Sequence, residues 1–362
     1  MTDRYFRVKV GSTFSKNYKV TSGVPQGSVL GPLLFLIFIN DLPDGIKSFV
    51  SLFADDVKMV TKTSDVTVAQ QDLELLNQWQ KNWLLSFNTR DGKCKVLHIG
   101  KDNPHNTYEL DGHALPVVES EKDLGLHIDS KLNWTEHIQK CINKAKAVVG
   151  WVSRNVISRD TNVILNIYKS LIRPHLEYAV QLWNLPVVYG NWGLISDIEK
   201  VQRAITRMID GIGLMPYKER LKKLDITTLV ERRIRGDLIE TFKITMGHVT
   251  YGKSMFTISR SGYNIRKTAG KINFLPNRIA NYWNKIPDFV KDAHSTDSFK
   301  HRLEMYKTNI VNEDLSAAGH YWEVSEMLFN KINDTNRDSY VSFMLENPII
   351  AKRKNVNIRL NV

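Results

Sequence analysis

Two adjacent aspartates, Asp55 and Asp56, are the residues whose types and spacing point most directly to chemistry. Carboxylates held side by side repel each other, and a cation that neutralises both removes this cost. Mg²⁺ prefers oxygen ligands and is often held by one or two carboxylates together with substrate phosphates. The alternative for an isolated pair is a solvated turn, because aspartate is common in turns. The surrounding sequence must decide between the two.

Two apolar segments flank the aspartates and must position them. Residues 49–53 and 57–60 are rich in aromatic and β-branched side chains, which favour β-strands. Such segments on either side of a short acidic stretch predict a tight β-hairpin with Asp55 and Asp56 at its tip.

A glycine-spaced segment precedes this hairpin by about twenty residues. Its glycines and the polar residues that could reach a ligand are Ser22, Gly23, Gln26, Gly27, Ser28 and Gly31. Glycine lets backbone approach another surface closely, so the segment could line a pocket. The alternative is a loop that leads into a helix near Pro32, with residues 33–39 packed in the core.

Three stretches carry a resemblance to a known family. Residues 21–35, 39–43 and 53–56 (Phe-Ala-Asp-Asp) together resemble the palm of reverse transcriptases, in the family's order and at its usual separation. More narrowly, they resemble the jockey and CR1-like non-LTR retrotransposons of animals. The resemblance implies that Asp55 is a metal-binding catalytic carboxylate and that Asp56 is its less strictly required neighbour. The implied nucleotide and template contacts are Ser22, Gln26, Gly27 and Phe53, the last in place of a tyrosine.

The family activity is metal-dependent transfer of a nucleotide to a primer 3′-hydroxyl on an RNA template. Two metal ions about 4 Å apart activate the 3′-oxygen and stabilise the pyrophosphate, so the protein supplies carboxylates and geometry. The resemblance therefore implies Mg²⁺ or Mn²⁺ as cofactor, with an RNA template, a DNA primer and deoxynucleotide triphosphates as partners. The location in the cell stays open, and for a functional protein the resemblance implies an intracellular one that acts at chromosomal DNA in the nucleus.

Further palm elements are expected downstream. Residues 67–87 have helical periodicity, with Trp79 and Trp83 on the apolar face and therefore in the core. The alternating residues 93–99 predict a strand, and by resemblance Lys93 is a catalytic candidate that could protonate the pyrophosphate. Lys95 is the rival, and a solvated strand lysine is the alternative.

A Leu-Gly pair, Leu124 and Gly125, matches the family's primer-grip region. A glycine there would let backbone lie against the primer strand, and an ordinary strand glycine is the alternative.

The chain becomes helical after Trp134, and residues 197–210 show the clearest pattern. Lys200, Arg203 and Arg207 recur at three- and four-residue steps, away from the apolar face, and such a ridge suits the phosphates of a nucleic-acid duplex. A solvated basic face is the alternative. Further basic residues extend this character: Lys222, Lys223, Arg232, Arg233 and Arg235.

Composition agrees with these expectations. The 362 residues carry a net charge of +12, which favours polyanionic partners, nucleic acid before anionic membrane. The longest apolar run, residues 33–39, is far shorter than the roughly 20 residues that span a bilayer, so no membrane role is expected. Two cysteines exclude a disulfide framework.

The predicted fold class is α+β. We expect a partial reverse-transcriptase palm of antiparallel strands with packed helices at 1–130, a helical thumb at 131–250 and a C-terminal helical module at 251–310. Residues 311–362 form a tail of unknown role with only patchy helical signal. An incomplete palm should leave apolar surface and sheet edges exposed.

The family's first palm motif, with its own metal-binding aspartate, is expected before the strand predicted at residues 5–10. The chain has no room for it, so we expect a fragment that is inactive or nearly so alone. One alternative is a non-catalytic nucleic-acid-binding remnant that uses the basic helices. Another is a protein-interaction module reused by the host, for which the sequence offers no positive feature.

Overall fold

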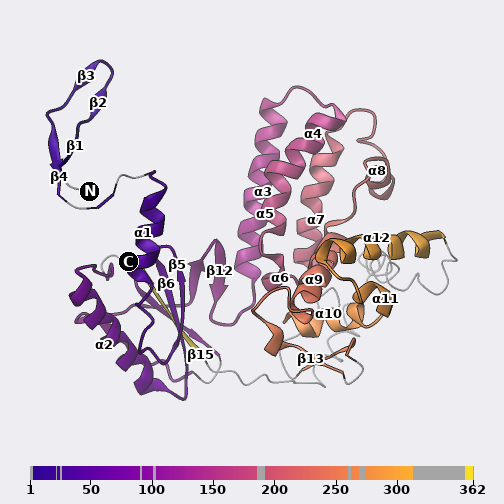
Figure 1. Ribbon diagram of the computed structural model, residues 1–362. Helices are drawn as coiled ribbons and strands as arrows, with labels where there is room; N and C mark the ends of the chain where they lie inside the picture. Colours follow the sequence, from indigo (N-terminus) through magenta and orange to yellow (C-terminus); the bar gives the residue numbers. More distant parts are fainter. Residues whose placement is uncertain are drawn as a thin grey trace. The chain divides into compact units, whose positions relative to one another are not determined.

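The computed structural model describes residues 3–21, 23–24, 27–89, 92–100, 103–185, 192–259, 262–268, 274–312 and 355–361. These residues form both helices and strands, as an α+β fold requires. They divide into two compact units, Met1–Glu121 with Lys354–Val362, and Lys122–Arg353 (Figure 1).

A five-stranded sheet forms the centre of the first unit. Its order is β10-β7-β15-β6-β5, and the strands are β5 (Phe49–Phe53), β6 (Asp56–Lys62), β7 (Lys95–Ile99), β10 (Val117–Val118) and β15 (Asn355–Asn361). The predicted amphipathic helix is α2 (Val66–Trp83), and its buried Ala69, Leu73 and Leu76 share a core with Val57 and Met59 of β6. The apolar face predicted for this helix therefore packs against β6 and supports it.

Short antiparallel pairs complete the first unit. β1 (Arg4–Phe6) pairs with β4 (Tyr18–Val20), and β1 lies within the strand predicted at residues 5–10 apart from Arg4. β2 (Lys9–Val10) pairs with β3 (Thr13–Phe14), and β8 (Glu109–Leu110) pairs with β9 (His113–Ala114).

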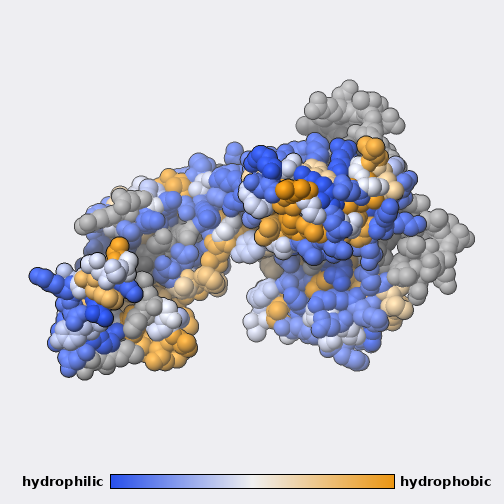
Figure 2. All heavy atoms as spheres, turned by 90° about the horizontal axis from the view of Figure 1, so that it is seen from above, coloured by the Kyte–Doolittle hydropathy of each residue, from blue (hydrophilic) through white to orange (hydrophobic). Residues whose placement is uncertain are grey.

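The core packing of residues 33–39, given as an alternative, and the burial expected for Trp83 are both wrong. Residues 30–39 form helix α1 (Leu30–Ile39), but among them only Ile39 is buried, whereas Leu36 and Ile37 are 56% and 66% exposed. Trp83 is 45% exposed at the end of α2, where it meets the ring of Phe38 edge-on. The expected exposure of apolar surface is thus present, and Figure 2 shows apolar patches within a largely hydrophilic surface.

The second unit is mainly helical. Its elements are β12 (Leu126–Asp129), α3 (Thr135–Asn155), α4 (Thr161–Ile167), a π-helical turn (Tyr168–Ile172), α5 (Arg173–Glu177), α6 (Val180–Trp183), α7 (Trp192–Arg207), α8 (Tyr217–Lys223), α9 (Leu229–Thr245), a 3₁₀ turn (Lys253–Met255), β13 (Thr257–Ile258), β14 (Ile265–Arg266), α10 (Leu275–Trp283), α11 (Asp288–Lys291) and α12 (Thr296–Asn312). β12 pairs with β11 (Ser120–Asp123). The apolar face of α3 is buried at Ile138, Ile142, Ala145, Val149 and Val152, and α3 confirms that the chain becomes helical after Trp134.

Strand β15 is the least expected element. The sequence places residues 355–361 in a tail without a defined role, yet they pair with β6 on one side and β7 on the other. Polar and apolar residues alternate through this segment, which is the period of a strand, but a period alone does not identify the partners.

The helices of the described segments include none that is both long and apolar enough to cross a membrane.

Candidate functional site

The β5–β6 hairpin predicted around the aspartates is present. Phe53 pairs with Asp56 across the antiparallel ladder, so only Ala54 and Asp55 remain in the turn. Ala54 has a φ of 51°, in the left-handed region that tight hairpin turns require. Asp55 is exposed in the turn and Asp56 is the half-buried first residue of β6. The adjacent carboxylates therefore lie at the end of a paired hairpin, with the exposed ring of Phe53 directly before the turn.

A buried carboxylate on α2 anchors the other end of this hairpin. Asp72 is 1% exposed and accepts hydrogen bonds from the backbone amides of Lys47 at 3.0 Å and Ser48 at 2.8 Å. The Ser48 hydroxyl also donates to Asp72 at 2.5 Å and lies 2.6 Å from the hydroxyl of Thr61 in β6. These bonds join α2, the entrance to β5 and the end of β6.

Sequence analysis missed Asp72, although one signal was available. Asp72 lies on the same helical face as Ala69 and Leu76, where an acidic residue is out of place unless it has partners. The pattern indicates a buried, hydrogen-bonded carboxylate but not which amides it contacts.

The glycine-spaced segment is only partly described. Ser22 and Gln26 lie outside the described residues, so their roles stay predictions. Gly27 has a φ of 82°, a conformation that L side chains rarely adopt. Gly31 is within the first turn of α1, which agrees with a loop that leads into a helix.

The two lysine candidates differ in their surroundings. Lys95 forms an ion pair with Glu121, with 2.8 Å between Nζ and Oε2. Lys93 is exposed and precedes β7 by two residues. Arg359 of β15 pairs with Lys58 of β6 on one side and with Lys95 of β7 on the other, so these two lysines lie at the same level of the sheet. Lys93 precedes Lys95 by two residues and therefore lies toward the end of the sheet where Asp55 and Asp56 are. One strand separates β7 from β6, which corresponds to roughly 9.5 Å between their backbones.

The Leu124–Gly125 pair forms a turn between β11 and β12, so a strand glycine is wrong for this position. Both residues have positive φ, 44° and 88°. The Tyr178 hydroxyl donates to the carbonyl oxygen of Leu124 at 2.9 Å. A Cβ at Gly125 would lie 3.4 Å from the Tyr178 ring, so this turn already contacts protein.

The basic residues of α7 do not form one uniform ridge. Lys200 and Arg207 are exposed, and Lys200 donates to Asp197 at 2.8 Å. Arg203 is half-buried and its guanidinium lies 4.6 Å from the centre of the Tyr217 ring. Two of the three predicted cations are therefore available to a polyanion, whereas Arg203 also contributes to packing against α8.

Two other basic residues have structural roles. Arg232 binds both carboxylate oxygens of Glu177, and Arg233 is 3% exposed in the core of α9. These residues extend the basic character of the sequence, but Arg232 is paired with the half-buried Glu177 and Arg233 is buried, so neither adds a freely accessible charge.

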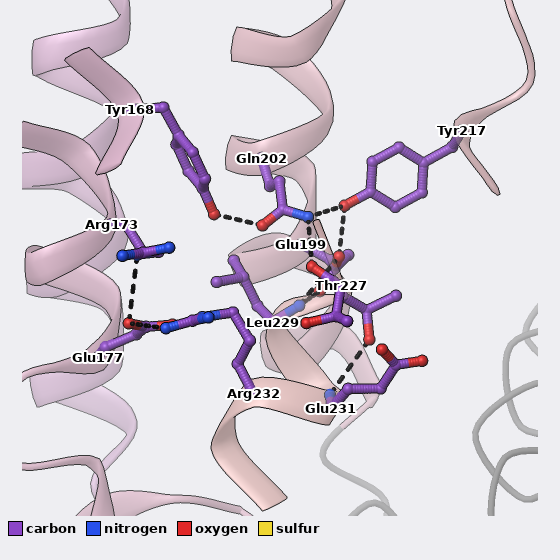
Figure 3. Close-up of polar contacts among 11 residues, drawn as sticks. Tyr168, Arg173, Glu177, Glu199, Gln202, Tyr217, Thr227, Leu229, Glu231 and Arg232 are labelled. Atoms are coloured by element: carbon purple, nitrogen blue, oxygen red, sulfur yellow. Dashed lines mark hydrogen bonds and ion pairs between the residues drawn. The ribbon is translucent and has the colours of Figure 1, made fainter. Parts of the chain in front are cut away.

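A buried polar network lies behind the exposed face of α7 (Figure 3). Gln202 accepts a hydrogen bond from the Tyr168 hydroxyl and donates to the Tyr217 hydroxyl at 2.9 Å. The Tyr217 hydroxyl donates to Glu199, which also accepts the Leu229 amide at 3.1 Å. Burial raises the pKa of the Glu199 carboxyl, and its bond to Leu229 satisfies the first turn of α9. Sequence analysis missed this network. The available signal was that the polar residues Glu199 and Gln202 lie next to the apolar face of α7.

The hairpin suits a divalent ion that substrate also helps to hold. Within the described segments, no group of three or more His, Cys, Asp or Glu side chains is arranged to bind a metal. Asp55 and Asp56 offer two adjacent carboxylates at an exposed turn, which matches the way Mg²⁺ combines one or two carboxylates with substrate phosphates.

Comparisons with known proteins agree with the resemblance. Residues 2–128 match the family described as "Reverse transcriptase (RNA-dependent DNA polymerase)". The chain is 30% identical over 243 residues to the RNA-directed DNA polymerase from the mobile element jockey of Drosophila melanogaster, covering 62% of this chain and 25% of that protein. It is 28% identical over 222 residues to the probable RNA-directed DNA polymerase from transposon X-element of the same fly, covering 58% and 24%. The chain thus spans about a quarter of the length of these relatives. No solved structure matches.

Proposed function

We propose that the chain, whose residues 2–128 match the reverse transcriptase family, contributes part of an RNA-directed DNA polymerase active site. The observation that carries the proposal is the β5–β6 hairpin, which ends in Asp55 and Asp56 and is tied to α2 through Asp72. Relatives named as RNA-directed DNA polymerases of retrotransposons support the same assignment.

In this proposal residues 1–130 act as a partial palm, 131–250 as the thumb and 251–310 as a packing module. Asp55 and Asp56 hold Mg²⁺ or Mn²⁺ together with the phosphates of a deoxynucleotide triphosphate. Such ions would activate the primer 3′-hydroxyl and stabilise the pyrophosphate. Ser22, Gln26, Gly27 and Phe53 contact the nucleotide or template base, and Lys93 donates a proton to the pyrophosphate.

Lys200 and Arg207 contact the phosphates of the RNA–DNA duplex. Their exposure on α7 supports this role, because a sequence-independent contact needs charge that is accessible to the backbone of the duplex. Leu124 and Gly125 are retained as the primer-grip candidates.

Primer extension by the full chain on poly(rA)–oligo(dT), with Mg²⁺ or Mn²⁺, tests the proposal. Extension that Asp55→Ala abolishes and Asp44→Ala preserves would show a working polymerase site and contradict the expected inactivity. Salt-sensitive binding of the duplex without extension would support the second candidate, a non-catalytic nucleic-acid-binding remnant. A chain that binds neither metal nor duplex would overturn both.

A further inference from the structure

The central strand of the five-stranded sheet comes from the far end of the sequence. β6 and β7 do not pair with each other, and β15 lies between them (Figure 1). β15 is antiparallel to both neighbours and pairs with β6 along its whole length, from Asn355 opposite Lys62 to Asn361 opposite Asp56. Without β15 the sheet would separate into the pairs β5–β6 and β7–β10, each with an unpaired backbone edge.

The alternating sequence of β15 matches the observed register. Val356, Ile358 and Leu360 alternate with polar residues. The ladder pairs them with Thr61, Met59 and Val57, the three positions of β6 whose side chains are buried. A slip by one residue would bring asparagine or arginine opposite those positions, so the hydrophobic pattern disfavours that shifted pairing.

We propose that the gap between β6 and β7 is a strand-acceptor site for the chain's own residues 355–361, and that its occupancy holds Asp56 in place. Main-chain hydrogen bonds to both edges supply the affinity and the alternating residues supply the register, as in other cases of β-strand addition. The docking itself is independent of the proposed polymerase role.

A tethered occupant is favoured over the same segment of a second copy. Residues 355–361 belong to the same chain as the acceptor strands, and covalent linkage gives such a segment an effective concentration of the order of millimolar. The protein at micromolar concentration presents far less of the competing strand, so docking within one chain dominates.

The position of Asp56 links this site to the hairpin. Asp56 is the first residue of β6 and pairs with Phe53 on one side and Asn361 on the other. Loss of β15 leaves Asp56 with only one neighbouring strand, in the part of the hairpin nearest to its turn.

Hydrogen exchange on the full chain tests docking. Ile358→Pro removes a ladder amide in the middle of a central strand, whereas Lys354→Pro immediately before the strand leaves the ladder intact. We expect Ile358→Pro, but not Lys354→Pro, to speed exchange in residues 56–62 and 95–99 by about tenfold or more. Amides of α3 and α7 should be unchanged, which shows that the variant is folded. Adding a synthetic peptide of residues 353–362 should restore protection. Unchanged exchange in both strands of the Ile358→Pro variant would overturn the proposal.

A cysteine pair tests the register and the source of the strand. Val60→Cys with Asn357→Cys joins two directly opposed positions, and Val60→Cys with Ile358→Cys is the control shifted by one residue. We expect a disulfide within one chain for the first pair and little for the second. A disulfide that links two chains would contradict docking within one chain and would show strand exchange instead.

Discussion

Asp72 accepts two hydrogen bonds from Ser48, one from the backbone amide at 2.8 Å and one from the hydroxyl at 2.5 Å. Ser48 immediately precedes β5, and Asp72 lies on the buried face of α2. The position of the hairpin that carries Asp55 and Asp56 is therefore coupled to a single buried carboxylate.

Replacing Asp72 should destabilise the first unit. Asp72→Ala leaves the amides of Lys47 and Ser48 without an acceptor, and we expect unfolding to become easier by about 2–3 kcal/mol. Urea unfolding of the full chain, followed by hydrogen exchange in α2 and β6, measures the effect. Glu74→Ala, at an exposed acidic residue of the same helix, is the control and should change stability little. Equal stability of the two variants would contradict the anchoring role of Asp72.

The exposed cations of α7 give a matched test of duplex binding. Lys200 pairs with Asp197 and Lys300 pairs with Asp297, both at 2.8 Å and both three residues apart on a helix. We expect Lys200→Ala to weaken binding of an RNA–DNA duplex. The slope of the logarithm of the binding constant against the logarithm of the salt concentration should fall by about the amount that one phosphate contact contributes. Lys300→Ala should leave the affinity and this slope unchanged. Filter binding over a series of salt concentrations measures this. Identical salt slopes for the two variants would remove Lys200 from the interface.

Arg203 should behave differently from its neighbours on α7. Its guanidinium contacts the Tyr217 ring, so Arg203→Ala should reduce stability by about 1 kcal/mol in addition to any effect on binding. Arg207→Ala, at an exposed position, should affect binding alone. Thermal unfolding separates the two variants, and equal melting temperatures would contradict a packing role for Arg203.

The second unit should lose stability in acid through His137. Burial, followed by the positive charges of His127, Lys144 and Lys140, lowers the pKa of His137 to about 4. In the unfolded chain its pKa is about 6.5, so between these values the unfolded state binds more protons and stability falls as the pH falls. The loss from pH 7 to pH 4 should reach about 3 kcal/mol, at about 1.4 kcal/mol for each pKa unit.

His137→Phe keeps a ring beside Trp183 and removes the titrating group. Its stability should therefore depend less on pH between 4 and 6.5 than that of the unsubstituted chain. Denaturant unfolding at pH 7, 5.5 and 4.5 makes the comparison. Parallel pH profiles for the two proteins would assign the acid sensitivity to other groups.

Local patterns predicted the elements better than the contacts between them. The apolar segments around Asp55 and Asp56 predicted the hairpin, and the helical period of residues 67–87 predicted α2, because both patterns depend on nearby residues. The turn at Leu124–Gly125 depends on Tyr178, and the position of β15 depends on β6 and β7. These partners are distant in sequence, and single-residue propensities carry no information about them. The burial of Arg233 likewise depends on packing between helices that the sequence does not show.

Divalent-ion binding by the full chain tests the central claim most directly. Electron paramagnetic resonance of free Mn²⁺, titrated with the protein and a deoxynucleotide triphosphate, reports the bound fraction. We predict that Asp55→Asn and Asp56→Asn each weaken Mn²⁺ binding by about tenfold or more. Asp44→Asn, at an exposed carboxylate of the same unit, should bind as the unsubstituted chain does. Equal Mn²⁺ affinity for Asp55→Asn and the unsubstituted chain would contradict the assignment of this hairpin as the metal-binding part of a polymerase site.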